Sequence, residues 1–254
     1  NENEYANMLF PRPPLSEQKR IAAILSTWDT AIEKTDDLIQ AKEQQKKALM
    51  QKLLSGEIRF SGFKEPWKEV QLGDVFNERK ESNLQHLPLL AITGSTGVIN
   101  RDDLERRDTS NKDKSKYKRI CPGDIGYNTM RMWQGVSALS DLEGIVSPAY
   151  TIVNPKKEMD ALFASYLFKY HPVIFLFYRY SQGLVSDTWN LKFHHFSEVK
   201  IKIPSSLNEQ MKIASLFKNI DEEVSILKKE KTALELQKKG LMQKLLTGEV
   251  RVKL

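Results

Sequence analysis

Cysteine is nearly absent from this sequence, since Cys121 is the only one in 254 residues. A single cysteine excludes a disulfide within the chain and any zinc site that needs several thiolates. We interpret Cys121, which precedes Pro122, as an ordinary small residue. Long apolar runs and a secretory signal are missing as well, so we expect a cytoplasmic protein that makes no contact with a membrane.

Motifs that bind cofactors or metals are missing too. No glycine-rich nucleotide loop occurs, and Asn154-Pro155 lacks the second proline and the aromatic residue of a DNA methyltransferase motif. His194 and His195 are adjacent, and on a strand neighbouring side chains face opposite sides, so the two cannot easily share a metal. The sequence therefore predicts no catalytic residue, no metal and no cofactor in this chain.

One acidic cluster keeps a catalytic alternative open. Asp102, Asp103 and Glu105 are the residue types that hold a divalent metal in a nuclease. The acidic-x-Lys segment that should follow on a strand is missing. A stand-alone metal-dependent nuclease is therefore an alternative function, and alanine at Asp102 or Asp103 would test it.

What the chain does have is positive charge. The net charge is +6 and the isoelectric point is about 9.1. Charged residues make up 28% of the chain and hydrophobic ones 40%, as expected for a soluble protein with long exposed helices. This balance permits a nucleic-acid partner without proving one.

The sequence also contains a long internal repeat. Residues 15–59 align without a gap with residues 207–251, and 20 of the 45 positions are identical. The most similar parts are KKALMQKLLSGEIRF, from Lys46, and KKGLMQKLLTGEVRV, from Lys238. Residues 60–206 separate the two copies, which excludes a solenoid because its repeats follow one another directly.

Each copy predicts a long helix. Pro13 and Pro14 precede Leu15, Ser16 can cap the helix, and Gly56 should end it. At 1.5 Å per residue, forty residues give a rod of about 60 Å. Apolar residues recur at heptad positions, with some lysines among them, which is typical of a coiled coil. We expect the two helices to pair antiparallel within one chain or between two chains. The heptad positions are Ile21, Leu25, Trp28, Ile32, Thr35, Ile39, Lys42, Lys46, Leu49 and Leu53 in the first copy and Ile213, Phe217, Ile220, Val224, Leu227, Lys231, Leu234, Lys238, Leu241 and Leu245 in the second.

The segment between the copies predicts a separate mixed domain. Short apolar runs at 87–93, 97–99, 145–153 and 199–204 are strand-like. Residues 159–180 predict a helix that is broken at Pro172, and residues 181–193 predict a loop. The fold class is therefore α+β, with one mixed α/β domain flanked by two long helices that form an antiparallel coiled coil.

Three segments of this domain carry side chains suited to DNA. A basic run spans residues 106–119, and two loops combine amides, cations and indoles, at 128–134 and 182–192. Arginine and lysine can bind guanine, and asparagine and glutamine can bind adenine, in the major groove. The candidate DNA-binding residues are Arg106, Arg107, Lys112, Lys114, Lys116, Lys118, Asn128, Thr129, Arg131, Trp133, Gln134, Gln182, Trp189, Asn190 and Lys192.

Some repeated residues lie off the heptad stripe, so pairing of the helices does not demand them. Their repetition indicates a second surface on the helix ends that binds the same partner twice. The candidates for this partner-binding face are Gln51, Lys52, Glu57, Gln243, Lys244 and Glu249.

These features resemble one known family. PPLSEQKRIAAIL followed by KKALMQKLLSGEIRF resembles the conserved helices of the specificity (S) subunits of Type I restriction–modification systems. GDIGYNTMRMWQG, IVSPAYTIV and the run into VKIKIPSSLNEQ resemble their target recognition domain. The resemblance implies a non-catalytic subunit of a defence system against foreign DNA. Such a subunit reads double-stranded DNA and holds methyltransferase (M) subunits, which bind S-adenosylmethionine, and restriction/translocase (R) subunits complete the enzyme.

The resemblance implies four segments: residues 1–14 as the remnant of a preceding recognition domain or a tail, 15–59 as the first conserved helix, 60–206 as the recognition domain, and 207–254 as the second helix. A usual S subunit has two recognition domains, whereas this sequence has one. We therefore expect two chains to associate into a homodimer that reads a bipartite target. A coiled-coil adaptor that binds protein and no DNA is the other alternative.

Overall fold

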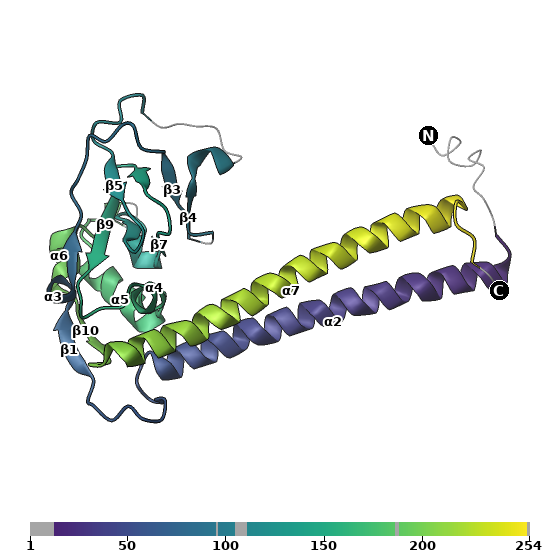
Figure 1. The fold of residues 1–254 in the computed structure, drawn as a ribbon, viewed down its shortest axis with the longest axis horizontal. Helices are drawn as coiled ribbons and strands as arrows, with labels where there is room; N and C mark the ends of the chain where they lie inside the picture. Colours follow the sequence, from purple (N-terminus) through teal and green to yellow (C-terminus); the bar gives the residue numbers. More distant parts are fainter. Residues whose placement is uncertain (1–12, 95, 105–110, 186–187, 253–254) are drawn as a thin grey trace. The chain divides into compact units, whose positions relative to one another are not determined.

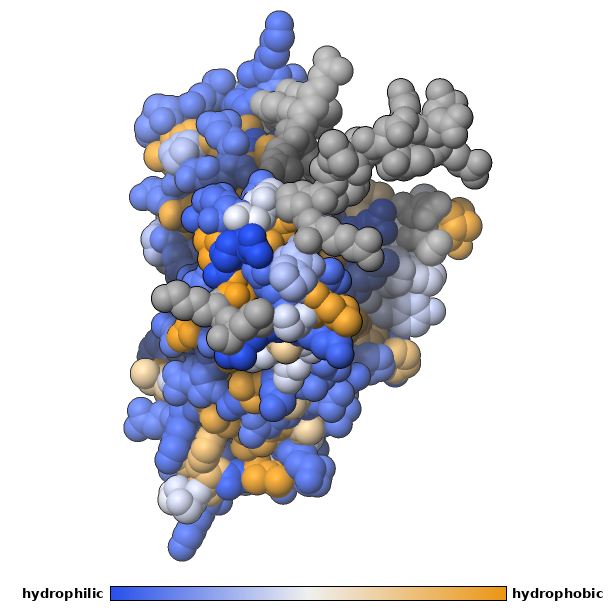
Figure 2. Space-filling view, turned by 90° about the vertical axis from the view of Figure 1, so that its right-hand side faces the viewer, coloured by the Kyte–Doolittle hydropathy of each residue, from blue (hydrophilic) through white to orange (hydrophobic). Residues whose placement is uncertain are grey.

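The computed structural model describes residues 13–94, 96–104, 111–185 and 188–252. The chain forms two compact units, which we call the helical unit (residues 1–47 and 218–254) and the central unit (residues 48–217). In the described residues no helix is long and apolar enough to cross a membrane. On the face shown in Figure 2, hydrophilic residues predominate and hydrophobic ones form small patches among them.

The two predicted long helices are confirmed. Helix α2 spans Leu15–Leu53 and helix α7 spans Leu207–Thr247. In the helical unit they lie side by side and antiparallel (Figure 1), since Asp29 of α2 pairs with Lys238 of α7 while Lys46 pairs with Asp221. Pairing therefore occurs within one chain. The apolar heptad residues Ile21, Ile39, Ile220, Val224 and Leu245 are buried there, as the periodicity predicts.

Four heptad positions of the two helices are lysines, which bring positive charge to the apolar interface (the seam) between the helices. Lys42, Lys46, Lys231 and Lys238 each form an ion pair with an acidic residue of the opposite helix. Their side chains are only 22–32% exposed, so the methylene stems cover the apolar seam while the ammonium groups reach its edge. Because an antiparallel partner in another register would leave these lysines without a carboxylate, the pairs also fix the register.

The repeat is reflected in matched contacts. Arg251 forms a two-pronged ion pair with Glu17 in the helical unit, at 2.8 and 2.6 Å. Arg59 forms the equivalent pair with Glu209 in the central unit, at 2.8 and 2.7 Å. Both carboxylates are almost fully buried, with side chains 4% and 1% exposed. A buried carboxylate that loses its partner is costly, so the repeated Glu and Arg stabilise the structure.

The helix ends are repeated in the same way. Helix α2 ends at Leu53, just before Gly56, the residue predicted to end it, and Gly56 adopts a left-handed conformation with φ +76°. Gly248 repeats this at φ +77°. The amide of Ile58 then donates to the Lys52 carbonyl at 3.1 Å, and the amide of Val250 to the Lys244 carbonyl at 3.2 Å. The two helix ends thus close in the same way over a left-handed glycine, a conformation that glycine adopts at little cost, which explains why glycine recurs there.

Acid should weaken the helix pair. The hydrogen bond from Arg251 lowers the pKa of Glu17 below its ordinary 4.5, and the hydrogen bond from Lys231 lowers the pKa of Asp36 below its ordinary 3.8. Both carboxylates therefore stabilise the folded helix pair at pH values above those ordinary pKa values. Their contribution is lost as the pH falls through the lower pKa values of the folded state. We expect the melting temperature of the helical signal in circular dichroism to drop between about pH 5 and pH 3. A Glu17→Gln, Asp36→Asn variant should have a lower melting temperature at neutral pH, and its melting temperature should depend less on pH. The same dependence of melting temperature on pH in both proteins would contradict this.

The central unit is built around an antiparallel sheet of four strands in the order β2-β9-β6-β7. Three two-stranded ladders, β1-β10, β3-β4 and β5-β8, accompany it. The strands are β1 (Lys68–Gln71), β2 (Phe76–Glu78), β3 (Leu90–Ile92), β4 (Val98–Asn100), β5 (Lys118–Ile120), β6 (Ile125–Asn128), β7 (Ser137–Leu139), β8 (Gly144–Val146), β9 (Tyr150–Pro155) and β10 (Lys200–Ile203).

Short helices complete this unit: α3 (Leu72–Val75), η1 (Arg101–Asp103), η2 (Met132–Gln134), α4 (Ala161–Leu167), α5 (His171–Tyr180) and α6 (Phe193–Glu198). The predicted break near Pro172 is confirmed, and Pro172 stands in the first turn of α5, where its missing amide hydrogen costs nothing. His194 and His195 do not lie on a strand, so the argument that a strand would turn their side chains to opposite faces does not apply. They lie on α6, with ring centroids 3.8 Å apart.

An aromatic core holds the central unit together. Phe196 of α6 is fully buried and its ring contacts five others, those of Phe76, Tyr127, Phe168, Phe177 and Phe193. The part of the long helices that belongs to this unit packs on the same core, with Leu53, Ala214 and Phe217 buried and the Phe217 ring 5.2 Å from Tyr166 of α4. The core thus joins the sheet to the helix ends inside one unit.

Candidate nucleic-acid interface

Two of the three predicted DNA-binding segments meet in the central unit. The turn after β6 carries Thr129, and the segment that leads into α6 carries Leu191. The amide of Leu191 donates to the Thr129 carbonyl at 2.8 Å, which ties the segments together. Trp133 of the first segment also contacts Trp189 of the second edge to face, with ring centroids 5.3 Å apart. Residues that are about 60 positions apart in the sequence therefore form one continuous surface.

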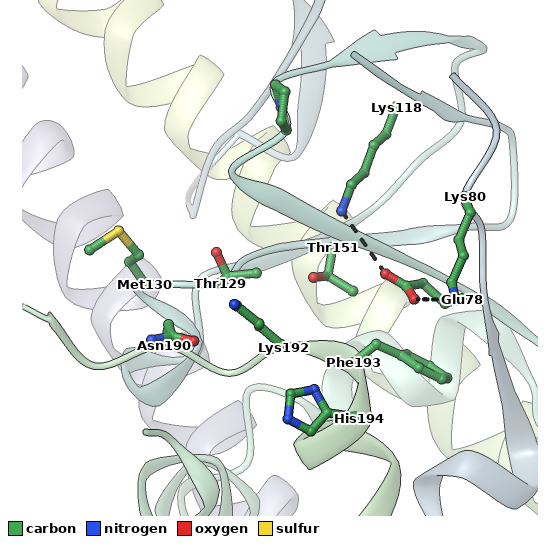
Figure 3. A pocket seen from close by; sticks show the side chains of 11 residues that line it. Glu78, Lys80, Lys118, Thr129, Met130, Thr151, Asn190, Lys192, Phe193 and His194 are labelled. Carbon is green, nitrogen blue, oxygen red and sulfur yellow. Dashed lines mark ion pairs between the residues drawn. The ribbon is translucent and has the colours of Figure 1, made fainter. Parts of the chain in front are cut away.

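A cleft of about 570 Å³ opens where the segments meet. Figure 3 shows three lysines around it, Lys80, Lys118 and Lys192, together with Glu78, the one carboxylate among the described residues that line it. Glu78 lies 3.5 Å from Lys80 and 4.0 Å from Lys118. The lining therefore carries a net positive charge and can attract a phosphate. Its lining residues are Glu78, Lys80, Lys118, Thr129, Met130, Pro148, Thr151, Asn190, Lys192, Phe193 and His194.

The three lysines are not equivalent. Lys118, on β5, donates to the Tyr150 carbonyl at 2.8 Å, and burial lowers its pKa. Lys80 has a side chain that is 79% exposed, and Lys192 is exposed as well. Because Lys118 is already engaged in the wall, Lys80 and Lys192 are the cations best placed to bind an incoming anion.

The amides of the candidate segments are partly committed to the fold. The side-chain nitrogen of Asn190 donates to the carbonyls of Gln182 and Thr188, both at 3.1 Å. The side-chain oxygen of Asn128 accepts from the Met130 amide at 3.0 Å. Each side chain has thus used one half of the donor and acceptor pair that a bidentate contact with adenine requires. Asn128 and Asn190 therefore hold the two segments in shape and can offer a base only their remaining group.

Other candidates remain available to a ligand. Arg131 and Gln134 are exposed, and their side chains make no hydrogen bond or ion pair with any residue the structure describes. Gln182 is exposed too, and its side-chain nitrogen lies 3.4 Å from the Tyr180 carbonyl. Trp133 donates from its indole nitrogen to the Met130 carbonyl at 3.0 Å. Arg131 and Gln134 are therefore the members of the set that are best placed to read a base edge.

The basic run is only partly described. Arg106 and Arg107 lie outside the described residues. Lys112 and Lys116 are exposed, whereas Lys114 is half-buried with its ammonium 5.1 Å from the Tyr117 ring centroid. Lys116 lines a second hollow, of about 1040 Å³, beside β3. Among the described residues of the run, Lys118 is the one that lines the cleft.

Sequence reasoning missed several residues of the cleft. Glu78 and Lys80 come from the end of β2, and Pro148 and Thr151 come from the turn into β9 and from β9 itself. Only the antiparallel pairing of β2 and β6 with β9 brings these positions together. A local motif could not have revealed them, because the signal lies in strand pairing between distant segments.

The acidic cluster of the nuclease alternative is also only partly described. Asp102 and Asp103 lie on η1, and Glu105 lies outside the described residues. Among the residues that the structure describes, no group of three or more His, Cys, Asp or Glu side chains could hold a metal ion.

The candidate partner-binding residues lie at the two ends of the helices. Gln51, Lys52 and Glu57 are exposed, and so are their repeats Gln243, Lys244 and Glu249. Lys244 lies 3.6 Å from Glu249. Arg59 and Arg251, which we also noted as repeated, are engaged in the ion pairs with Glu209 and Glu17. The six exposed residues are thus repeated charges and amides outside the ion pairs that join the two helices.

Comparison with known proteins follows the same division of the chain. The family described as Type I restriction modification DNA specificity domain matches residues 64–236. A Methanocaldococcus jannaschii protein named as the MjaX specificity subunit of a type I restriction enzyme is 28% identical over all of this chain and 62% of its own length. The MjaVIII specificity subunit of the same organism is 28% identical over 98% of this chain and 64% of its own length.

Solved structures show the same fold. The HsdS subunit of Thermoanaerobacter tengcongensis superposes with a TM-score of 0.54 at 20% identity and covers 98% of this chain and 63% of its own. The S subunit from M. genitalium gives a TM-score of 0.57 at 19% identity, covering 91% of this chain and 61% of its own. This chain therefore spans less than two thirds of the length of these relatives. Because the family match covers more than half of its residues, the chain belongs to the Type I restriction modification DNA specificity domain family.

Proposed function

We propose that this chain is a non-catalytic subunit that reads one half of a bipartite DNA target and holds methyltransferase subunits in place. The observation that supports DNA reading most directly is the lysine-lined cleft where the two candidate loops meet. A duplex offers phosphates to Lys80 and Lys192 and base edges to Arg131 and Gln134. The chain would act in the cytoplasm, with S-adenosylmethionine bound by the methyltransferase partner.

A footprint on DNA tests the proposal. The chain should protect a short DNA segment mainly when the methyltransferase subunit of its own system is present. The affinity should fall steeply between about 50 and 200 mM salt, because bound phosphates release their counterions. A chain that captures a partner protein yet protects no DNA at low salt would favour the adaptor alternative. Cleavage of DNA by the purified chain with Mg²⁺ would favour the nuclease.

The repeated helix ends support two equivalent partner sites. Lys52 and Lys244, like the other exposed repeats, are related by the 192-residue repeat. Each lysine stands four residues before a left-handed glycine, Gly56 or Gly248, so each end presents the same chemistry. A partner that binds one end would find an equivalent surface at the other. We therefore propose two methyltransferase subunits for each pair of helix ends, with restriction subunits joining them.

Charge reversal at these lysines should reduce the stoichiometry. We expect Lys52→Glu or Lys244→Glu alone to leave one methyltransferase subunit bound tightly and to weaken the other about tenfold or more. The double variant should lose both, as native mass spectrometry would show. Lys229→Glu, an exposed lysine in the middle of α7, is the matched control. Two bound subunits on the double variant would show that the partner binds elsewhere.

An exposed surface in the helical unit supports a second recognition domain, because its repeat in the central unit is buried. In the central unit, Leu54 and Ala214 are 3% and 1% exposed beneath the aromatic core. Their repeats in the helical unit are open, with Leu246 57% exposed and Ala22 exposed as well. A hollow of about 420 Å³ lies beside them. We propose that a second copy of the chain supplies the domain that covers this site, which makes a homodimer.

The Leu246→Asp variant should then be a monomer when its mass is measured by light scattering.

A further inference from the structure

The two ends of one loop next to the cleft are hydrogen-bonded to each other, and we call this paired base of the loop its neck. The amide of Gln182 donates to the Asn190 carbonyl at 2.9 Å, and the amide of Asn190 donates to the Gln182 carbonyl at 2.8 Å. Gly183 adopts φ +148°, and a Cβ there would lie 2.7 Å from the Thr188 backbone. The neck is therefore too narrow for any side chain at residue 183. We call the described residues 182–185 and 188–190 the apolar loop; residues 186–187 are not part of the site.

The side chains that follow the neck are apolar and exposed. Leu184 is 101% exposed and Val185 is 58% exposed. The backbone behind them is bonded, since the hydroxyl of Thr188 donates to the Val185 carbonyl at 2.9 Å and the amide of Thr188 donates to the same oxygen, also at 2.9 Å. Two adjacent exposed aliphatic side chains on a bonded loop are a surface that a partner could cover.

The base of the apolar loop rests on aromatic rings. The Trp189 ring lies 4.9 Å from that of Tyr178 and 5.3 Å from that of Trp133, edge to face in both cases. Such contacts hold the loop at a fixed position on α5 and η2. The base of the loop is thus anchored to the central unit.

The same segment also enters the cleft. Asn190 closes the neck and lines the cleft, and Lys192 follows two residues later. A ligand that contacts both parts must therefore offer an anionic group and an apolar surface within a few residues of each other. A DNA duplex does so once a base step opens, because the apolar faces of the unstacked bases then lie beside its phosphates. A protein partner would need an acidic group next to a small hydrophobic pocket, and no other observation calls for one.

We propose that Leu184 and Val185 form an apolar wedge that enters a base step of the bound DNA and bends the duplex. The proposal rests on the proposed function, since it places the wedge beside the DNA bound at the cleft. Aliphatic side chains inserted in this way unstack two base pairs and open an angle between them. The bend would bring more of the duplex against the lysines of the central unit.

Fluorescence energy transfer between the two ends of a duplex tests the wedge. The full chain is assembled with its methyltransferase partner on a duplex that contains the methylated sequence. The wild-type complex should shorten the end-to-end distance, whereas Leu184→Ser, Val185→Ser should leave the bound DNA nearly straight and weaken binding about tenfold. Leu184→Phe keeps an apolar wedge and should restore the bend. Leu236→Ser, at a 70% exposed leucine of α7, is the control.

The outcomes separate the wedge from the proposed function. If the wild-type complex binds no DNA, the proposed function fails and the wedge fails with it. If the wild-type complex and the serine variant bind and bend DNA equally, the wedge is overturned while the proposed function stands. If the serine variant loses its methyltransferase partner before DNA is added, the apolar loop is a protein contact, and the wedge is overturned as well.

Discussion

Replacing Phe196 by alanine should lower the free energy of unfolding of the central unit by about 3–5 kcal/mol. Phe196 is fully buried and stands at the centre of the ring cluster, with ring centroids 5.3 Å from Tyr127 and 5.7 Å from Phe168. Removing the ring deletes contacts with helices and sheet at once, and a rigid surround cannot collapse into the space. A loss of this size is a large share of the stability of a domain.

Urea unfolding followed by tryptophan fluorescence would measure this loss. Phe175→Ala, at a phenylalanine of α5 that is 52% exposed, is the matched control and should change the stability much less. A loss below about 1 kcal/mol for Phe196→Ala would contradict the account of the core, because it would mean that the surrounding rings repack without cost.

Reversing the charge of the two exposed cleft lysines should have the largest effect on DNA binding. We expect the Lys80→Glu, Lys192→Glu variant to bind DNA about a hundredfold more weakly at low salt. The slope of its log affinity against log salt concentration should fall by the amount expected for the loss of about two phosphate contacts. Both side chains are exposed at the cleft, and Glu78 is the one carboxylate among its described lining residues. Two more glutamates would turn its net charge negative and repel the phosphates.

Fluorescence anisotropy of a labelled duplex, titrated at several salt concentrations, would measure both effects. Lys200→Glu, Lys202→Glu changes the net charge by the same amount at exposed lysines of β10, which do not line the cleft. This control should keep most of the affinity. If both variants weaken binding equally, the overall charge and not the cleft governs the contact with DNA.

The helices could be predicted from the sequence because their signals are local. The heptad pattern predicted both helices and their pairing, and Gly56 indicated the end of the first one. The repeat also indicated that matching residues matter at both ends. It could not show that Arg59 and Arg251 serve the fold, because their partners Glu209 and Glu17 lie far away in the sequence.

The central unit was harder to predict because its strands are short. The runs that became β3, β4, β9 and β10 carry enough apolar residues to indicate strands, whereas β1, β2 and β5 do not. The helix that carries the histidine pair could not be predicted, because neither helix nor strand periodicity can be read from six residues. Which amides are free to bind DNA could not be predicted either, since Asn190 is held by the neck of a loop that only the fold defines.

The most direct test of the account is to map methylated sites in cells that carry this chain and its methyltransferase partner. The account predicts a bipartite motif, in which Arg131→Ala or Gln134→Ala relaxes the requirement for one or two bases of a half-site and leaves the spacing unchanged. Both side chains are exposed beside the cleft, so their loss should alter reading without unfolding the unit. An unchanged motif in both variants, with Lys80→Glu, Lys192→Glu still methylating at the wild-type rate, would contradict the claim that this surface reads DNA.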